Sequence, residues 1–288
     1  MIRHLLEFLE RAASRLEWKT AQRIGGFLGL VWYTLVPVRR RTVMRNLALA
    51  MPGVSDKERR RIAREHYVHL GKCAFEFLWL AGRGMQKSDI IAEEKGIEHY
   101  HGCLEKGRGV IVVTGHFGNW DLVGCMQAAK GVPLHVVTKD LSHRGFNSYW
   151  MGRREKAGIR FHPDKRSLKS IIRALKSNEV VGLVIDQRTH QEQGGIKADF
   201  MGHAAWTSTT AAVLALRTGA RLLPAYGYRR KDGLHAMEIG PPVDVSAYGD
   251  YSKEAVAGLT QHLNDDLAKR IRQHPEQWLW LHRRWADT

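Results

Sequence analysis

Apolar positions along the chain alternate between helical and strand spacing. Helical spacing recurs at residues 2–18, 55–80, 143–157, 165–176 and 252–272. Short apolar runs rich in β-branched residues lie between these segments, at 110–113, 133–138, 180–185 and 221–228. Strands that alternate with helices are typical of βαβ units. We therefore predict an α/β fold with a mixed, mostly parallel sheet flanked by helices.

The N-terminal region contains two apolar segments of different kinds. Residues 2–18 predict an amphipathic helix, and residues 24–38 carry no charge and are followed by four arginines, Arg39, Arg40, Arg41 and Arg45. A membrane span needs roughly 20 apolar residues. We therefore predict a tilted or interfacial attachment to an anionic membrane surface, with a buried core helix as the alternative. This gives attachment helices at 1–50 and a single α/β domain at 51–288.

The candidate chemistry is concentrated in GRGVIVVTGHFGNWDL, residues 107–122. Gly115 and Gly118 bracket His116 after a buried strand, and Asp121 opens the next helix. On a regular helix, side chains five positions apart point about 140° away from each other. We predict that His116 lies in a glycine-rich bend, so that Asp121 reaches one ring nitrogen. The other nitrogen would then deprotonate a hydroxyl.

Asp186 is a second candidate, because it follows the strand at 180–185 and is itself followed by Gln187. A carboxylate at the carboxyl end of a parallel strand can line the same crevice as His116. The alternative is a capping aspartate at a turn. Near His116 no second histidine or carboxylate has the usual ligand spacing, so we predict no metal site. Cys73, Cys103 and Cys125 match no disulfide or zinc framework.

Beyond the motif, two segments are informative. Residues 189–199 form a polar stretch with two glycines, and we predict a mobile flap there. The ending PEQWLWLHRRW, residues 275–285, joins tryptophans to cations. That composition suits either a membrane interface or packing on the domain itself.

The segment GRGVIVVTGHFGNWDL resembles the signature of the late lipid A biosynthesis acyltransferases, within the lysophospholipid acyltransferase superfamily. Three further blocks resemble the same family in order and spacing. They are VVGLVIDQR at 180–188, DFMGHAAWTSTTAAVLALRTGARLLPAY at 199–226 and PEQWLWLHRRW at 275–285. The resemblance covers nearly the whole chain.

This resemblance implies transfer of a fatty acyl chain from a thioester donor to a hydroxyl of a lipid A precursor. The donor would be an acyl carrier protein or acyl-CoA, used as a co-substrate, and no other cofactor is expected. His116 and Asp121 would be catalytic, and Asp186 would belong to the site. The resemblance also implies an inner-membrane protein, attached at the cytoplasmic face through its N-terminal helices.

Four further residues are candidates for substrate binding. The resemblance places a functional arginine at about Arg153, and Arg144 lies on the same predicted helix. Arginine forks match the geometry of phosphate groups. Asn119 and Gln187 complete the set because they lie next to the catalytic candidates.

The formal charge of +16 indicates which kinds of molecule the protein can bind. Such a surface attracts phosphates, anionic membranes, nucleic acid or acidic proteins. The sequence has no helix-turn-helix, zinc-finger or RNA-recognition signature, so we do not expect nucleic acid as a partner. The arginines that follow residues 24–38 favour an anionic phospholipid surface. The resemblance implies an acidic acyl carrier protein as the donor, and its charge suits a basic enzyme. Three rivals stay open: a glycerophospholipid or other glycolipid acyltransferase, a hydrolase, and a non-enzymatic basic protein that binds membranes or nucleic acid.

Overall fold

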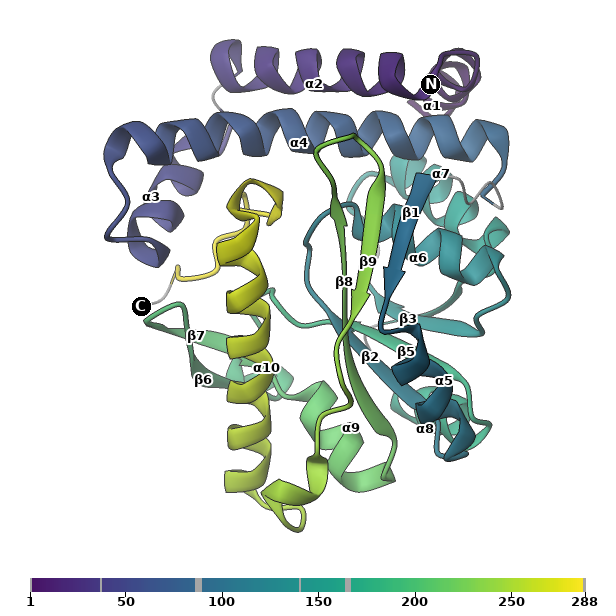
Figure 1. Cartoon of the computed structure of the whole chain (residues 1–288), viewed down its shortest axis with the longest axis vertical. Helices are drawn as coiled ribbons and strands as arrows, with labels where there is room; N and C mark the ends of the chain where they lie inside the picture. Colours follow the sequence, from purple (N-terminus) through teal and green to yellow (C-terminus); the bar gives the residue numbers. More distant parts are fainter. Residues whose placement is uncertain (1, 37, 86–89, 140, 164–166, 287–288) are drawn as a thin grey trace.

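A mixed sheet forms the centre of the protein (Figure 1). The computed structural model describes residues 2–36, 38–85, 90–139, 141–163 and 167–286. Within these residues, seven strands lie in the order β1-β9-β8-β2-β5-β3-β4, and neighbouring strands are parallel except β8 and β9. The strands are β1 (Ile91–Lys95), β2 (Val110–Thr114), β3 (Leu134–Thr138), β4 (Arg160–Pro163), β5 (Val180–Val184), β8 (Arg221–Arg229) and β9 (His235–Ile239). The predicted α/β class with a mostly parallel sheet is confirmed.

Helices cover both faces of the sheet. The helices α5 (Ile97–Glu105), α6 (Trp120–Ala129) and α7 (Arg144–Lys156) contribute to one apolar core. The helices α8 (Leu168–Lys176), α9 (Thr210–Thr218) and α10 (Lys253–Gln273) contribute to the other. Successive side chains of a strand point to opposite faces. Ile111 and Val113 of β2 therefore enter the second core, whereas Val110 and Val112 enter the first.

The long helix α4 (Asp56–Arg83) crosses the end of the sheet and joins the two cores (Figure 1). Its start is capped, because the Ser55 hydroxyl accepts a hydrogen bond from the Glu58 amide at 3.3 Å. Tyr67 packs in one core and Phe77, further along the helix, packs in the other. The helix therefore fixes both layers relative to the edge of the sheet where the candidate site lies.

The N-terminal helices are α1 (Ile2–Ser14), α2 (Trp18–Leu35) and α3 (Arg40–Ala50). Helix α2 lies along α4, and glycines form the contact. A Cβ atom on Gly29 would lie 2.1 Å from the Tyr67 carbonyl oxygen, so only glycine allows this approach. The opposite side of α2 leaves Phe27 and Leu28 64% and 46% exposed. No helix within the described residues combines the length and the hydropathy that a membrane-spanning segment needs.

Residues 189–199 differ from the predicted flap. They contain a short 3-10 helix, η2 (Gln191–Gln193), and most of β6 (Gly195–Phe200), which pairs antiparallel with β7 (His203–Ser208). The alternation of Ala198 and Phe200 inward with polar residues outward favours a strand. The Asn264 side chain of α10 donates to the Asp199 carbonyl at 2.9 Å, so the hairpin is fastened to the domain. Two more 3-10 helices are η3 (Val245–Tyr248) and η4 (Pro275–Gln277).

Candidate active site

His116 and Asp186 meet at the carboxyl ends of two adjacent parallel strands. In the register of β2 and β5, Thr114 is paired with Val184. Both strands end at these residues. His116 and Asp186 each follow two positions later, and the Nδ1 atom of His116 lies 2.7 Å from Oδ1 of Asp186. The structure thus brings Asp186 beside His116, at the edge of the sheet where α/β folds place their ligands.

The carboxylate of Asp186 is buried and fully engaged. It is 2% exposed, and its second oxygen, Oδ2, accepts from the His116 backbone amide at 2.8 Å and from the Trp278 indole at 2.7 Å. Burial by itself would raise the pKa of Asp186. The charge and hydrogen bonds of His116, together with the Trp278 bond, outweigh burial and lower the pKa to about 2. Asp186 is therefore an anion at neutral pH.

The second ring nitrogen of His116 faces an exposed residue. The Gln187 amide donates to Nε2 of His116 at 3.1 Å, while Nδ1–H donates to Asp186. In this tautomer Nε2 carries the lone pair that a general base needs. Burial opposes protonation of the ring, but the charge and hydrogen bond of Asp186 prevail and raise the pKa of His116 above 6.5. Because the Gln187 side chain is exposed, it can move aside for an acceptor hydroxyl.

Asp121 does not make the predicted contact with the imidazole. Its Oδ1 atom instead forms an ion pair with Nε of Arg154, at 3.1 Å. Helix α6 begins at Trp120, so Asp121 lies in the first helical turn with its side chain directed at α7, while His116 lies in the preceding bend. The charge of Asp121 still helps to raise the pKa of His116. A catalytic role for Asp121 stays a prediction.

The two neighbouring arginines of α7 face different partners. Arg153, the residue predicted from the resemblance, binds Glu10 of α1 through Nε at 2.6 Å and Nη2 at 3.0 Å. Arg154 pairs with Asp121 at the site. The contacts of Arg153 thus tie α7 to α1, and its predicted role in substrate binding remains untested. Arg144 is exposed at the first position of α7.

Asn119 has a structural position beneath the site. Its side chain accepts from the Leu122 amide at 3.3 Å and thereby caps α6. Its amide nitrogen donates to Oε2 of Glu76, at 2.9 Å, in the interior. Asn119 is 3% exposed, so these contacts direct it away from the surface where a substrate would arrive.

A buried ionic network holds the loop that carries His116. Arg229 of β8 binds Glu76 of α4 through Nε at 2.7 Å and Nη2 at 2.6 Å. His69 of α4 donates to the Gly118 carbonyl at 3.2 Å. Gly118 has a φ of +59°, and a Cβ atom there would lie 1.9 Å from the Gly227 carbonyl oxygen. The bend predicted around His116 therefore requires glycine at position 118.

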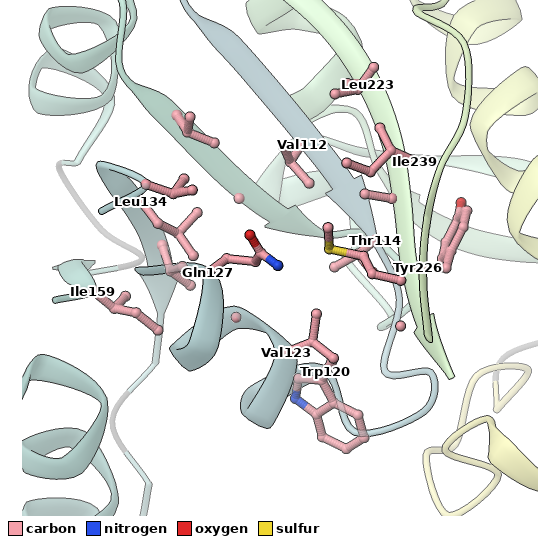
Figure 2. Close-up of a pocket in the computed structure, with 18 of the residues that line it drawn as sticks. Val112, Thr114, Trp120, Val123, Gln127, Leu134, Ile159, Leu223, Tyr226 and Ile239 are labelled. Carbon is pink, nitrogen blue, oxygen red and sulfur yellow. The ribbon is translucent and has the colours of Figure 1, made fainter. Parts of the chain in front are cut away.

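An apolar cavity lies between the sheet and α6 (Figure 2). Its walls come from β2, β3, β5, β8 and β9, and from α5, α6 and α7. The apolar residues that line it include Val112, Val123, Leu134, Ile159, Leu223 and Ile239. Trp120 also borders the cavity, and its ring centroid lies 4.9 Å from that of His116. Trp120 therefore contacts the candidate base and also lines the apolar cavity.

The cysteines are poor candidates for a nucleophile. Burial raises the pKa of Cys73 to about 12 and also raises the pKa of Cys125 well above its ordinary value. A thiol must ionise before it attacks. Both residues therefore stay protonated near neutral pH. Within the described part of the chain, no three metal-binding side chains come together.

The C-terminal block belongs to this site. Besides the Trp278 bond to Asp186, the buried Arg284 side chain donates to the Gln187 carbonyl at 3.5 Å and to the Thr207 hydroxyl at 2.6 Å. Of the two roles predicted for this block, packing on the domain is the one observed for these residues. Its involvement with Asp186 was not predicted, and the unusual run PEQWLWLHRRW was the available signal.

The chain matches the family model of the bacterial lipid A biosynthesis acyltransferases over residues 9–287. It is 27% identical over 277 residues to the lipid A biosynthesis lauroyltransferase of Escherichia coli, covering 94% of this chain and 86% of that protein. It is 22% identical over 262 residues to the lipid A biosynthesis myristoyltransferase of E. coli, covering 90% and 77%.

A third relative has a different name. The chain is 28% identical over 208 residues to the phosphatidylinositol mannoside acyltransferase of Mycolicibacterium smegmatis, covering 71% of this chain and 64% of that protein. The match to the family model extends over nearly the whole sequence and confirms the resemblance seen in the four sequence blocks. The chain belongs to the bacterial lipid A biosynthesis acyltransferases, a family of O-acyltransferases.

Proposed function

We propose that the protein transfers a fatty acyl chain from a thioester donor to a hydroxyl of a lipid A precursor. One observation carries this proposal. The imidazole of His116 is oriented by a buried carboxylate, presents a basic nitrogen toward the exposed Gln187, and lies beside an apolar cavity. A base beside a lipophilic chamber suits a reaction between a hydroxyl and a long-chain acyl group.

In the proposed reaction, Nε2 of His116 takes the proton of the acceptor hydroxyl while its oxygen attacks the thioester carbonyl carbon. The carbon–sulfur bond then breaks, and the leaving thiolate takes the proton back from Nε2. Asp186 stabilises the imidazolium that forms between these steps. The acyl group passes directly from sulfur to oxygen, without a covalent acyl-enzyme.

The cavity is suited to the hydrocarbon chain of the donor. Each methylene group removed from water contributes about 0.8 kcal/mol to binding. The side chains of Val112, Leu134 and Leu223 line the chamber and offer apolar contacts (Figure 2). Gly124 of α6 lines the cavity, and a Cβ atom there would make an ordinary van der Waals contact with Leu134, at 3.9 Å.

The donor in this proposal is an acyl carrier protein or acyl-CoA. Both are acidic molecules, and the net charge of +16 favours their approach.

Attachment to the inner membrane through α1 and α2 is part of the proposal. Phe8 of α1 and Phe27 and Leu35 of α2 are 61%, 64% and 75% exposed. Because α2 is fixed to α4 by its glycine face, its apolar side is free to enter the interfacial region of a bilayer. Arg39 and Arg41, just beyond α2, are exposed and suit the anionic cytoplasmic face.

A second acceptor is favoured by one comparison. The mycobacterial relative is named for phosphatidylinositol mannoside, a glycolipid of a different class. The His116 chemistry is the same for either acceptor, since each offers a hydroxyl.

The test uses the purified full-length protein and dodecanoyl donors labelled in the acyl chain, as acyl carrier protein and as CoA thioesters. Each donor is offered with a lipid A precursor, with phosphatidylinositol mannoside or with a lysophospholipid, and the products are identified by mass spectrometry. We expect a labelled lipid A product. If only another lipid is labelled, the proposed lipid A acceptor is wrong. If free fatty acid is the only product, the protein is a hydrolase. Tight, salt-sensitive duplex binding without transfer indicates the non-enzymatic alternative.

A further inference from the structure

The C-terminal segment contacts the candidate active site through Trp278. This residue is 1% exposed and donates its indole N–H to Oδ2 of Asp186 at 2.7 Å. The two residues are 92 positions apart, and the contact connects the chain end with the loop after β5. A buried tryptophan needs a partner for its N–H group, and here the partner is the carboxylate that orients His116.

The two oxygens of Asp186 are held in different ways. Oδ1 accepts only from the His116 ring among the contacts of the described residues, at 2.7 Å. Oδ2 accepts from the His116 backbone at 2.8 Å and from Trp278 at 2.7 Å. The indole bond comes from a separate part of the chain, so it opposes rotation of the carboxylate away from the ring.

The backbone fixes the indole relative to the loop of His116. The Leu279 amide donates to the His116 carbonyl at 3.0 Å, and the Gly118 amide donates to the Gln277 carbonyl at 2.9 Å. Phe117 and Trp278 form an antiparallel bridge between these two bonds. The loop and the C-terminal segment are thus paired in register, with Trp278 directly opposite the residue that follows His116.

We infer that Trp278 is a positioning residue of the acyl-transfer site, whose indole N–H holds the Asp186 carboxylate in the orientation that binds His116. The inference rests on the proposed function for its consequence in catalysis, but the positioning itself is a property of the folded chain. Phenylalanine fills most of the same space and lacks the N–H group. In Trp278→Phe, Asp186 keeps one donor on Oδ2 and rotates more freely, which weakens its bond to His116.

The charges around His116 allow this change to be measured. Asp186 and Asp121 raise the pKa of His116, and Arg154 lowers it. His282, on the C-terminal segment, is neutral near pH 7, because burial lowers its pKa to about 4. Trp278→Phe changes none of these charges. A change in the titration of His116 therefore reports the geometry of its bond to Asp186.

Trp280 provides a matched control. It lies two residues further along, is 0% exposed, and donates its indole N–H to the Pro275 carbonyl at 2.6 Å. Trp280→Phe therefore removes the indole hydrogen bond of an equally buried side chain in the same segment and leaves the donors to Asp186 in place. Thermal unfolding of both variants verifies that the fold is kept.

The experiment is an NMR titration of histidine ring nitrogens in the full-length wild type, Trp278→Phe and Trp280→Phe. The His116 signal is assigned by its loss in His116→Gln. We expect the pKa of His116 to fall by about half a unit in Trp278→Phe, as its bond to Asp186 weakens, and to stay unchanged in Trp280→Phe. In the transfer assay, kcat of Trp278→Phe should fall about tenfold with little change in KM. A His116 pKa that does not fall in Trp278→Phe overturns the inference.

A second measurement covers the case in which Trp278→Phe does not fold. In the wild type, one indole N–H signal should shift with the midpoint of His116, because both groups share Asp186, and this shift should disappear in His116→Gln. If no indole signal follows His116, the inference is wrong. Neither titration depends on turnover. If the wild type shows no acyl transfer, the proposed function is wrong, but the titrations still test the positioning role of Trp278.

Discussion

The Nδ1 atom of His116 lies 2.7 Å from Oδ1 of Asp186, although 70 residues separate them in the chain. Both residues follow the paired positions Thr114 and Val184 on adjacent parallel strands. The register of the sheet therefore creates the pair, and the Asp186 anion raises the pKa of the ring above its ordinary value.

This pair predicts the pH dependence of transfer. Only the neutral imidazole can accept a proton, and its pKa is raised above 6.5. The protonated, inactive form therefore persists above pH 6.5, and kcat/KM should rise with pH through a midpoint higher than that value. In Asp186→Asn the raising charge is lost, so the midpoint should move to lower pH while the maximal rate falls by at least about 10².

Asp121→Asn is the comparison for this prediction. Asp121 acts on His116 through its charge without a hydrogen bond to the ring, so its loss should shift the midpoint by less than Asp186→Asn does. Profiles of kcat/KM against pH for the three proteins make the test. A larger shift in Asp121→Asn would show that the carboxylate nearest in sequence governs the imidazole.

If the cavity holds the acyl chain, a change in its lining should change the preference for donor chain length. Gly124 lines the cavity opposite Leu134, and a Cβ atom there would lie 3.9 Å from that side chain without a clash, so a leucine would project between α6 and the sheet. Gly124→Leu should therefore favour donors a few carbons shorter than those preferred by the wild type, as measured by kcat/KM over a series of acyl donors. Gly102→Leu on α5 is the control, because no atom lies within 4 Å of a Cβ there and Gly102 does not line the cavity. An unchanged preference in Gly124→Leu would place the acyl chain elsewhere.

The buried pair of Glu76 and Arg229 predicts a large effect on stability. Removing Glu76 leaves the buried guanidinium of Arg229 without its carboxylate partner and also removes one of the two acceptors of the Asn119 amide nitrogen. Glu76→Ala should lower the free energy of unfolding by about 3–5 kcal/mol, measured by urea denaturation. Glu58→Ala, which breaks an exposed pair with Arg61, should change it too little to measure. Equal stabilities of the two variants would contradict the buried network.

The exposed face of α2 predicts where the protein meets lipid. A Phe27→Glu, Leu28→Glu double variant places two charges on that face and should lower the fraction that floats with anionic phospholipid vesicles. Leu168→Glu on α8 is the control, since Leu168 is 53% exposed on a helix far from α2 (Figure 1). Equal flotation of both variants would show that α2 does not attach the protein.

Local patterns in the sequence were enough to predict the fold class and the bend around His116. Alternating helical and strand periods indicate the α/β class, and Gly118 indicates the bend because it adopts positive φ. The partner of His116 could not be predicted in the same way. The identity of that partner depends on which strands are neighbours and on their register. No short motif predicts a pairing between residues 70 positions apart.

The orientation of α7 and the structure of residues 189–199 also depend on tertiary contacts. Neighbouring residues on a helix point about 100° apart, so a predicted helix over 143–157 does not say whether Arg153 or Arg154 faces the site. The structure turns Arg153 toward Glu10 and Arg154 toward Asp121. Likewise, the glycines near residue 195 suggested a flexible loop, but the side chains of α10 bind this segment as a strand.

The most direct test of the account is acyl transfer by His116→Ala. The purified variant is compared with the wild type and with His101→Ala, which replaces an exposed histidine of α5. Labelled lipid product is measured under identical conditions, and thermal unfolding confirms that each protein is folded. We predict that His116→Ala loses about 10²–10⁴ in rate while His101→Ala keeps the wild-type rate. A folded His116→Ala protein that transfers acyl chains as fast as the wild type would contradict general-base catalysis by His116.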